Sequence, residues 1–410
     1  MSQDNLDKRL DRLKQFIAGE PKSPATSSAP DKPAVPARYT RLAQALEGEV
    51  RTDLSGCYCV VRRLYPFDSP FGSITLTAPK ANHLPLAHYE AQAVAGEMDI
   101  SKAVFFDTET TGLGGVGAVP FLIGCGSLTE EGFEVRQYVL PDYADEAAML
   151  ERVMTEFGAD RALVSYNGRA FDAPLVRDRM IVNRVAREIP YVHHVDLLHA
   201  ARRLFKRRLH DCTLTNIERE IFGFHREDDI PGYLIPSVYF DWLAGDEIGD
   251  LPAVLEHNRL DIVSLYVLLL KVGEIFRSEG ADLESVDDLY SLSRVYERRK
   301  ERTRVVNIYR RIDSQSEMAP ESDVLWFHSL AFKREGDWSE AVAIWEQLAE
   351  GDSGEALRAE IELAKYYEHR VKDAASALEY AQRAARRTQS VGRFRDDLMV
   401  RMRRLRTKLD

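Results

Sequence analysis

A buried strand that ends in two acidic residues lies in the middle of the sequence. The apolar run AVFF at 103–106 is followed at once by Asp107 and, two residues later, by Glu109. Residues i and i+2 of an extended strand point to the same side, so the two carboxylates project together. Adjacent carboxylates are costly unless a positive charge lies between them. The chain must therefore fold so that this strand end meets a cation.

The segments around this strand define the fold class. Apolar runs predict strands over 103–107, 119–128, 133–140 and 162–167. Helices are predicted over 145–157, near 171–183 and over 254–274. Three strands in a meander, followed by alternating helix and strand, predict an α/β fold with a mixed sheet and flanking helices. We predict one domain over 101–275.

Two segments precede that domain. Residues 1–37 combine a short amphipathic helix over 5–18 with a Pro-rich linker over 19–37. Residues 38–100 contain the β-rich runs GCYCVVRRLYP and FGSITLTAP, separated by turn residues. We predict that 38–100 is a β-rich appendage packed on the domain at 101–275.

The C-terminal third, 285–405, shows no strand pattern and repeats itself. Small or apolar residues recur every 36 residues on one helical face in three copies: Val305, Ala341 and Ala377; Ile308, Ile344 and Tyr380; Ile312, Leu348 and Ala384. A period of about 34 residues in helix hairpins is typical of tetratricopeptide repeats. The third copy carries about three extra residues in EHRVKD at 368–373. An irregular helical bundle is the alternative.

The overall charge restricts how the chain can bind a polyanion. Its 410 residues include 55 Lys and Arg against 66 Asp and Glu, a net charge of -11. A protein of this charge must use local basic patches or bound metal ions to bind nucleic acid. RRLFKRR at 202–208 and the basic stretch 381–410 are two such patches. The alternative for the second is a solvated final helix that caps the repeats.

The cysteines and the apolar runs predict a cytoplasmic location. Cys57, Cys59, Cys125 and Cys212 have no zinc-site spacing, so we interpret them as buried apolar residues. The N-terminus has no apolar signal segment, and the longest apolar run is far too short to span a membrane. We expect a reducing location and no membrane partner.

Two further acidic motifs follow the first. SYNGRAFD at 165–172 places Asp172 at the start of a helix, where the helix dipole also favours an acid. HNRLD at 257–261 places His257 and Asp261 four apart on one helical face. That pair is alternatively a surface pair or a buried, satisfied His. Asp261 lies in an otherwise apolar helix, where a carboxylate is expensive unless it is paired or bound to a metal.

The four acids suggest a shared chemistry. Oxygen ligands suit Mg²⁺ and Mn²⁺, and two such ions can stabilise the attacking and leaving oxygens at a phosphate. A neutral His on the same helical face can take a proton from the attacking water. The hypothesis is a two-metal site with His257 as the base.

DTETTG, SYNGRAFD and HNRLD, in this order, resemble the three motifs of the DEDD exonuclease superfamily, which has a ribonuclease-H-like fold. With HVDLLHAARRLFKRR, LTNIEREIFGF and EDDIPG, the chain over about 50–390 resembles the bacterial YprB-like family with tetratricopeptide-like repeats. The resemblance implies two Mg²⁺ or Mn²⁺ ions, with the metal ligands Asp107, Glu109, Asp172 and Asp261.

The resemblance also implies contacts with the terminal nucleotide. These would come from Thr110, Thr111, Gly112 and Leu113. For Asn167 the sequence leaves three roles open: it contacts the substrate, it orients Asp172, or it only forms the Gly-containing turn. Asp196 is interpreted as a structural residue or an outer partner of the site. Family members have a catalytic His five residues before the last Asp or a Tyr four before it, whereas His257 lies four before Asp261. A Tyr at that position orients a water rather than deprotonating it. The sequence therefore supports the base role of His257 less strongly than the ligand role of Asp261.

The sequence leads to two candidate functions that belong to different classes. The first is a metal-dependent 3′–5′ exonuclease that hydrolyses phosphodiester bonds at single-stranded DNA or RNA ends, with repeats that recruit a protein partner. The second is a catalytically silent scaffold that binds nucleic acid or protein. The complete set of four acids favours the nuclease.

Overall fold

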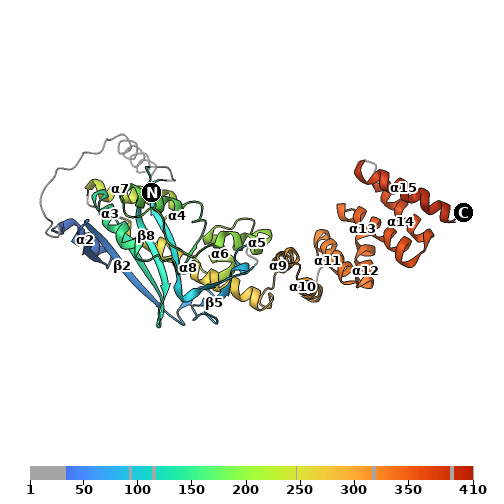
Figure 1. The fold of residues 1–410 in the computed structure, drawn as a ribbon, viewed down its shortest axis with the longest axis horizontal. Coiled ribbons are helices and arrows are strands. Elements are labelled where there is room, and N and C mark those ends of the chain that lie inside the picture. The colour runs from blue at the N-terminus through green and yellow to red at the C-terminus, as the bar shows by residue number, and fades with distance from the viewer. Residues whose placement is uncertain are drawn as a thin grey trace. The chain divides into compact units, whose positions relative to one another are not determined.

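The computed structural model describes residues 34–91, 95–112, 117–245, 247–315, 320–387 and 392–409. The helix predicted over 5–18 and most of the linker over 19–37 lie outside these residues. The chain forms two compact units, one containing residues up to Arg202 with Leu209–Phe276, the other Arg203–Arg208 with Arg277–Asp410 (Figure 1).

A seven-stranded mixed sheet forms the centre of the first unit. Its order is β1-β2-β9-β8-β7-β10-β11. The strands are β1 (Glu49–Thr52), β2 (Cys57–Pro66), β7 (Ala103–Thr110), β8 (Pro120–Leu128), β9 (Gly132–Val139), β10 (Ala162–Ser165) and β11 (His193–Asp196). The pairs from β1 to β7 are antiparallel, while β10 runs parallel to both β7 and β11. The predicted mixed sheet is confirmed, and the carboxyl ends of β7, β10 and β11 lie at one edge.

The segment 38–100 differs from the predicted appendage. It begins with a helix that the sequence analysis missed, α2 (Ala37–Ala45). Strand β2 then pairs with β9 from Cys59 to Pro66, so β1 and β2 extend the main sheet. Only the small pairs β3 (Pro70–Phe71) with β4 (Ile74–Thr75), and β5 (His83–Pro85) with β6 (Glu97–Asp99), form separate sheets. The apolar first half of β2 is buried, which is why this strand joins the core.

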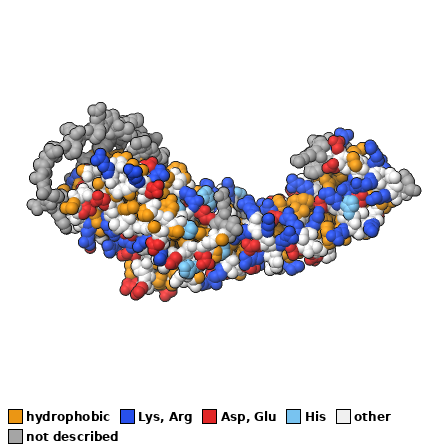
Figure 2. All heavy atoms as spheres, in the orientation of Figure 1, with side chains coloured by type: hydrophobic (Ala, Val, Ile, Leu, Met, Phe, Trp, Pro, Cys, Tyr) orange, Lys and Arg blue, Asp and Glu red, His pale blue; other side chains and the backbone are white. Residues whose placement is uncertain are grey.

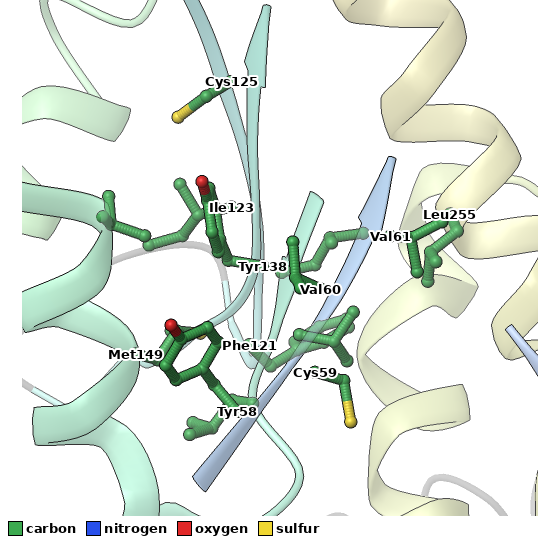
Figure 3. Close-up of a cluster of buried hydrophobic side chains, with 14 of the residues drawn as sticks. Tyr58, Cys59, Val60, Val61, Phe121, Ile123, Cys125, Tyr138, Met149 and Leu255 are labelled. Carbon is green, nitrogen blue, oxygen red and sulfur yellow. The ribbon is translucent and has the colours of Figure 1, made fainter. Parts of the chain in front are cut away.

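Helices cover both faces of the sheet. Figure 3 shows Met149 of α3 (Glu146–Met154) on one side of the strands and Leu255 of α8 (Leu251–Arg277) on the other. The other helices are α4 (Asp172–Val182), α6 (Leu214–Phe222), α7 (Ile235–Gly245) and α5 (Leu197–Leu209), whose residues Arg203–Arg208 belong to the second unit. Short 3-10 turns are η1 (Leu86–His88), η2 (Ile100–Lys102), η3 (Tyr143–Asp145) and η4 (Gly232–Leu234). The core residues around Tyr138 and Phe121 are fully buried.

Two glycines of β8 let α8 approach the sheet closely. A Cβ at Gly124 would lie 2.4 Å from the Asn258 Oδ1 atom, and one at Gly126 would lie 2.6 Å from the Ile262 Cγ2 atom. Both contacts are shorter than real Cβ atoms make, so only glycine fits. Because Gly124 pairs with Asp107 across the strands, this packing brings the acidic end of β7 against α8.

All of the described secondary structure of the second unit is helical. They are α9 (Val286–Arg298), α10 (Arg302–Gln315), α11 (Ser322–Glu335), α12 (Trp338–Ala349), α13 (Gly354–Tyr366), η5 (Tyr367–Val371), α14 (Ala374–Arg387) and α15 (Gly392–Leu409). The three sets of recurring residues fall on α10, α12 and α14, and all but Tyr380 are buried. The extra residues of the third copy form the π-helical turn η5, which ends at Lys372 with φ of 63°. The residues that recur in the sequence therefore lie at equivalent positions on α10, α12 and α14.

Several side chains of the two basic stretches form ion pairs. Arg207 contacts Asp287 and Asp323 at 2.6 and 2.7 Å, and Arg208 contacts Asp288 at 2.8 Å. Near the C-terminus, basic side chains of α14 contact the buried Glu360 and those of α15 contact the buried Glu368. Figure 2 shows basic and acidic side chains interspersed over these helices. These pairs favour a packing role for the C-terminal stretch.

The cysteines are free and buried, as expected. Among the described residues, no helix combines the length and the apolar character that crossing a membrane requires.

Candidate active site

The first two acids lie on the face of β7 that packs against α8. Asn258 of α8 donates from Nδ2 to the Asp107 Oδ2 atom at 2.9 Å. One potential ligand atom from each of Glu109, His257 and Asp261 lies within 4.8 Å of the others. The predicted projection of both β7 carboxylates to one side is therefore seen, and α8 supplies the residues that they face.

Asp172 reaches the same place from the start of α4. The Thr108 hydroxyl, on β7 between the two acids, donates to the Asp172 Oδ1 atom. The turn before α4 is held by Asp196, which is 1% exposed and accepts from the backbone N–H of Asn167 at 2.8 Å. A Cβ at Gly168 would lie 2.7 Å from the Ser165 hydroxyl oxygen, so this turn requires glycine. The structural interpretation of Asp196 agrees with these contacts.

The charges of the four acids act on one another. Burial raises the pKa of Asp107 well above its usual value, and the charges of Asp261, Asp172 and Glu109 raise it further. The pKa of Glu109 is also raised well above normal, by burial and then by Asp261 and Asp172. Burial is the main cause that raises the pKa of Asp172 to about 6. Four acids that repel one another in a low-dielectric site have strong affinity for cations.

His257 is held by an acid that the sequence analysis did not single out. Its Nδ1 atom lies 2.7 Å from the Asp229 Oδ1 atom, while Nε2 lies 3.7 Å from the Asp261 Oδ2 atom. An ionised carboxylate only accepts hydrogen bonds, so Nδ1 carries the proton and donates to Asp229. The lone pair of Nε2 then faces the acids.

A buried arginine completes this side of the site. Arg226 lies in the loop after α6, and its side chain is 4% exposed. It binds Glu218 of α6 through two hydrogen bonds of 2.6 Å and also donates to Asp261. Burial alone would lower the pKa of Arg226, but Glu218 and Asp261 together raise it above the usual value, so the guanidinium stays charged.

A second set of contacts holds Asp107 in place. Asn258 is fully buried, and its Oδ1 atom accepts from Gln137 Nε2 at 2.9 Å. Gln137 also donates to the Leu255 carbonyl at 2.7 Å. Asn258 is therefore oriented so that its amide nitrogen faces Asp107.

These supporting residues differ in how visible they are in the sequence. Asn258 lies inside the HNRLD motif and Asp229 inside EDDIPG, so both were within motifs already noted. Glu218 lies on the apolar face of α6 and is fully buried, a burial that a helical plot of 214–222 could have suggested. Arg226 lies in a loop, and no local pattern marks it.

The structure shows contacts within the protein for some of the residues that were expected to contact the nucleotide. The Thr110 hydroxyl donates to the Gly112 carbonyl at 2.6 Å, and the Thr111 hydroxyl accepts from the Val119 N–H at 3.0 Å. These contacts close the base of the loop after β7. A Cβ at Gly112 would meet open space. Leu113 lies outside the described residues. Asn167 has φ of 64°, is partly exposed and lies in the turn that leads to Asp172.

The donor set fits a divalent cation. Three Asp and one Glu supply oxygen ligands, which hard cations such as Mg²⁺ and Mn²⁺ prefer. The raised pKa values have the same physical origin as an affinity for such a cation, because both relieve carboxylate repulsion. Of the four acids, Asp261 is the one that Arg226 contacts.

Comparison with known proteins places the chain in a family. Residues 104–272 match the model of the RNase H superfamily. The uncharacterized protein YprB of Bacillus subtilis (strain 168) is 33% identical over 337 residues, which cover 80% of this chain and 80% of that protein. The chain belongs to the YprB family. Its sheet-bearing unit contains the ribonuclease-H-like domain that the motifs predicted.

Proposed function

We propose that the chain is a divalent-metal-dependent 3′–5′ exonuclease that hydrolyses phosphodiester bonds at single-stranded ends of nucleic acid. The convergence of Asp107, Glu109, Asp172 and Asp261 beside His257 is the observation that carries this proposal. These four acids would hold two Mg²⁺ or Mn²⁺ ions. Bound ions would neutralise phosphate charge and favour ionisation of the attacking water.

The residues of the chain supply the remaining steps. His257 Nε2 accepts the proton of the attacking water, and Asp229 holds the ring in the tautomer that leaves Nε2 free. Asn258 fixes the direction of the Asp107 carboxylate. The base role of His257, open in the sequence, is favoured by its contact with Asp229.

A single-stranded substrate is favoured by an exposed aromatic ring next to an acid of the site. Phe171 directly precedes Asp172 and is 59% exposed; Tyr191 and Tyr233 are exposed too, but most aromatic rings among the described residues of this unit are buried. Unpaired bases stack on exposed aromatic rings, and paired bases do not offer their faces. Phe171 and Asn167 both belong to the second acidic motif, in the turn that leads to Asp172, and we propose that both contact the strand end.

We also propose a binding role for the helical unit. Its repeats would recruit a protein or guide the nucleic acid, and the whole chain would act in the cytoplasm. Neither role enters the chemistry of the acidic site.

The direct test is cleavage of end-labelled single-stranded DNA and RNA with Mn²⁺ or Mg²⁺. The expected result is a ladder of products shortened from the 3′ end that disappears with chelator and with Asp107→Asn. Asp178→Asn is the matched control, because Asp178 lies exposed on α4 away from the acids, and it should leave cleavage intact. Products shortened from the 5′ end or internal cuts would contradict the exonuclease assignment. Absence of cleavage with folded protein would favour the scaffold.

A further inference from the structure

Arg226 contacts several side chains of the candidate site at once. Nε donates to Glu218 Oε2, and Nη2 donates to both Glu218 Oε1 and Asp261 Oδ1. Nη1 faces the Asp229 Oδ2 and His257 Nδ1 atoms, both at 3.4 Å. Four hydrogen bonds from the guanidinium thus go to carboxylates of the candidate site and its support, while His257 Nδ1, which carries its own proton, accepts none.

Burial restricts what Arg226 does. Its side chain is 4% exposed, and that of Glu218 is 1% exposed. A guanidinium this deep in the protein does not reach a substrate phosphate, so Arg226 acts through the residues that it contacts. Ser264 donates to Glu218 as well, which fixes the carboxylate against the guanidinium.

The contact with Asp261 sets this acid apart from the other three. Its Oδ1 atom accepts from Arg226, while Oδ2 lies 3.7 Å from His257 Nε2. A positive charge beside a ligand opposes a second positive charge at that ligand. Any group that stabilises the cation-free state also lowers the net affinity for the cation.

We propose that Arg226 is a resident counter-ion of Asp261 that holds the acidic site together before a divalent cation binds, leaves one Asp261 oxygen free as a ligand and restrains cation affinity. This inference rests on the proposed function, since it takes the four acids to be a divalent cation site. Arg226 is therefore a positioning residue, and Glu218 sets its effective charge.

The proposal predicts opposite effects for the two members of the buried pair. Arg226→Met removes the competing charge, so Mn²⁺ should bind about tenfold more tightly, which corresponds to about 1.4 kcal/mol. Glu218→Gln leaves the guanidinium without its neutralising partner, so Mn²⁺ should bind more weakly than to the wild type. Arg226→Met should also lower the melting temperature without Mn²⁺ and increase the rise in melting temperature that Mn²⁺ produces.

The experiment is calorimetric titration of the full chain with Mn²⁺ alone, together with thermal unfolding with and without Mn²⁺. Arg136→Met is the matched control. Arg136 is similarly buried and paired with Glu156 at 2.8 Å, and both residues lie with Tyr138 away from the acidic site. This variant should lose stability and keep the wild-type Mn²⁺ affinity.

The outcomes separate this inference from the proposed function. Equal Mn²⁺ affinity in the wild type, Arg226→Met and Glu218→Gln would overturn the inference alone. Weaker binding by Arg226→Met would also overturn it, because Arg226 would then only hold the ligands in place. Absence of Mn²⁺ binding by the folded wild type would overturn both proposals. If Arg226→Met does not fold, the double variant Glu218→Gln/Arg226→Met replaces it, and the weaker binding expected of Glu218→Gln remains decisive by itself.

Discussion

The contact between Asp229 and His257 leads to a quantitative prediction. Asp229→Asn removes the negative charge that keeps the proton on Nδ1 of His257. An Asn amide can donate to Nδ1 instead, which places the proton on Nε2 and removes the lone pair that faces the acids. The variant should therefore lose base catalysis while its fold and its cation ligands remain.

The magnitude follows from the hydrogen bond. The 2.7 Å distance between His257 Nδ1 and Asp229 Oδ1 is that of a good charge-assisted contact. Such bonds contribute about 1.5–3 kcal/mol. At about 1.4 kcal/mol for each factor of ten in rate, kcat should fall roughly 10- to 150-fold. His257→Gln should cost at least as much, because it removes the base itself.

The assay is single-turnover cleavage of an end-labelled strand at saturating Mn²⁺, for both single variants and the double variant. If Asp229 acts only through His257, the double variant should be no slower than His257→Gln. Asp228→Asn is the control, because Asp228 is exposed in the same loop and its φ of 51° suits Asn. A wild-type rate for Asp229→Asn, or additive losses in the double variant, would refute the reasoning.

Three further predictions test other parts of the molecule. Phe171→Ala should raise KM for a single strand about tenfold, since stacking contributes roughly 1–3 kcal/mol per base, and Ile181→Ala, exposed on the same helix, should leave KM unchanged in steady-state kinetics. Gly124→Ala should lower the free energy of unfolding by about 1–3 kcal/mol in denaturant titration, because a Cβ there meets Asn258 at 2.4 Å, whereas Gly117→Ala meets open space and should be neutral. Burial alone would raise the pKa of Glu368, but hydrogen bonds from Arg404 and Lys408 and the charge of Arg401 lower it to about 2. Because the pKa of Glu368 is lower in the folded protein than its unfolded value of about 4.5, the ionised carboxylate stabilises the folded protein above that pH. This stabilisation, at most about 3 kcal/mol, is lost as the pH falls toward 2. Thermal unfolding should show a stability advantage of the wild type over Glu368→Gln at pH 7 that shrinks by pH 3, and an advantage independent of pH would contradict the assignment.

The sequence predicted the shared direction of the first two acids because strand geometry is local. Two acids at i and i+2 on a strand project together whatever the rest of the chain does, and Asp107 and Glu109 do so here. The helix containing His257 was equally clear, since an apolar run of that length has few alternatives. The recurrence of apolar residues every 36 positions likewise depends only on helix packing between neighbours.

The supporting residues were hidden because they depend on contacts distant in sequence. Arg226 meets Asp261 across 35 positions and Gln137 meets Asn258 across 121. A buried arginine looks in the sequence like any surface arginine of a loop. The pairing of β2 with β9 could not be predicted for the same reason, because strand pairing is set by the whole sheet and not by the strand's own residues.

The measurement that tests the central claim most directly is anomalous scattering from crystals of the full chain soaked with Mn²⁺. The account predicts Mn²⁺ bound among the carboxylates of Asp107, Glu109, Asp172 and Asp261, with loss of that signal in Asp107→Asn. Well-ordered crystals in which these four side chains hold no Mn²⁺ would contradict it.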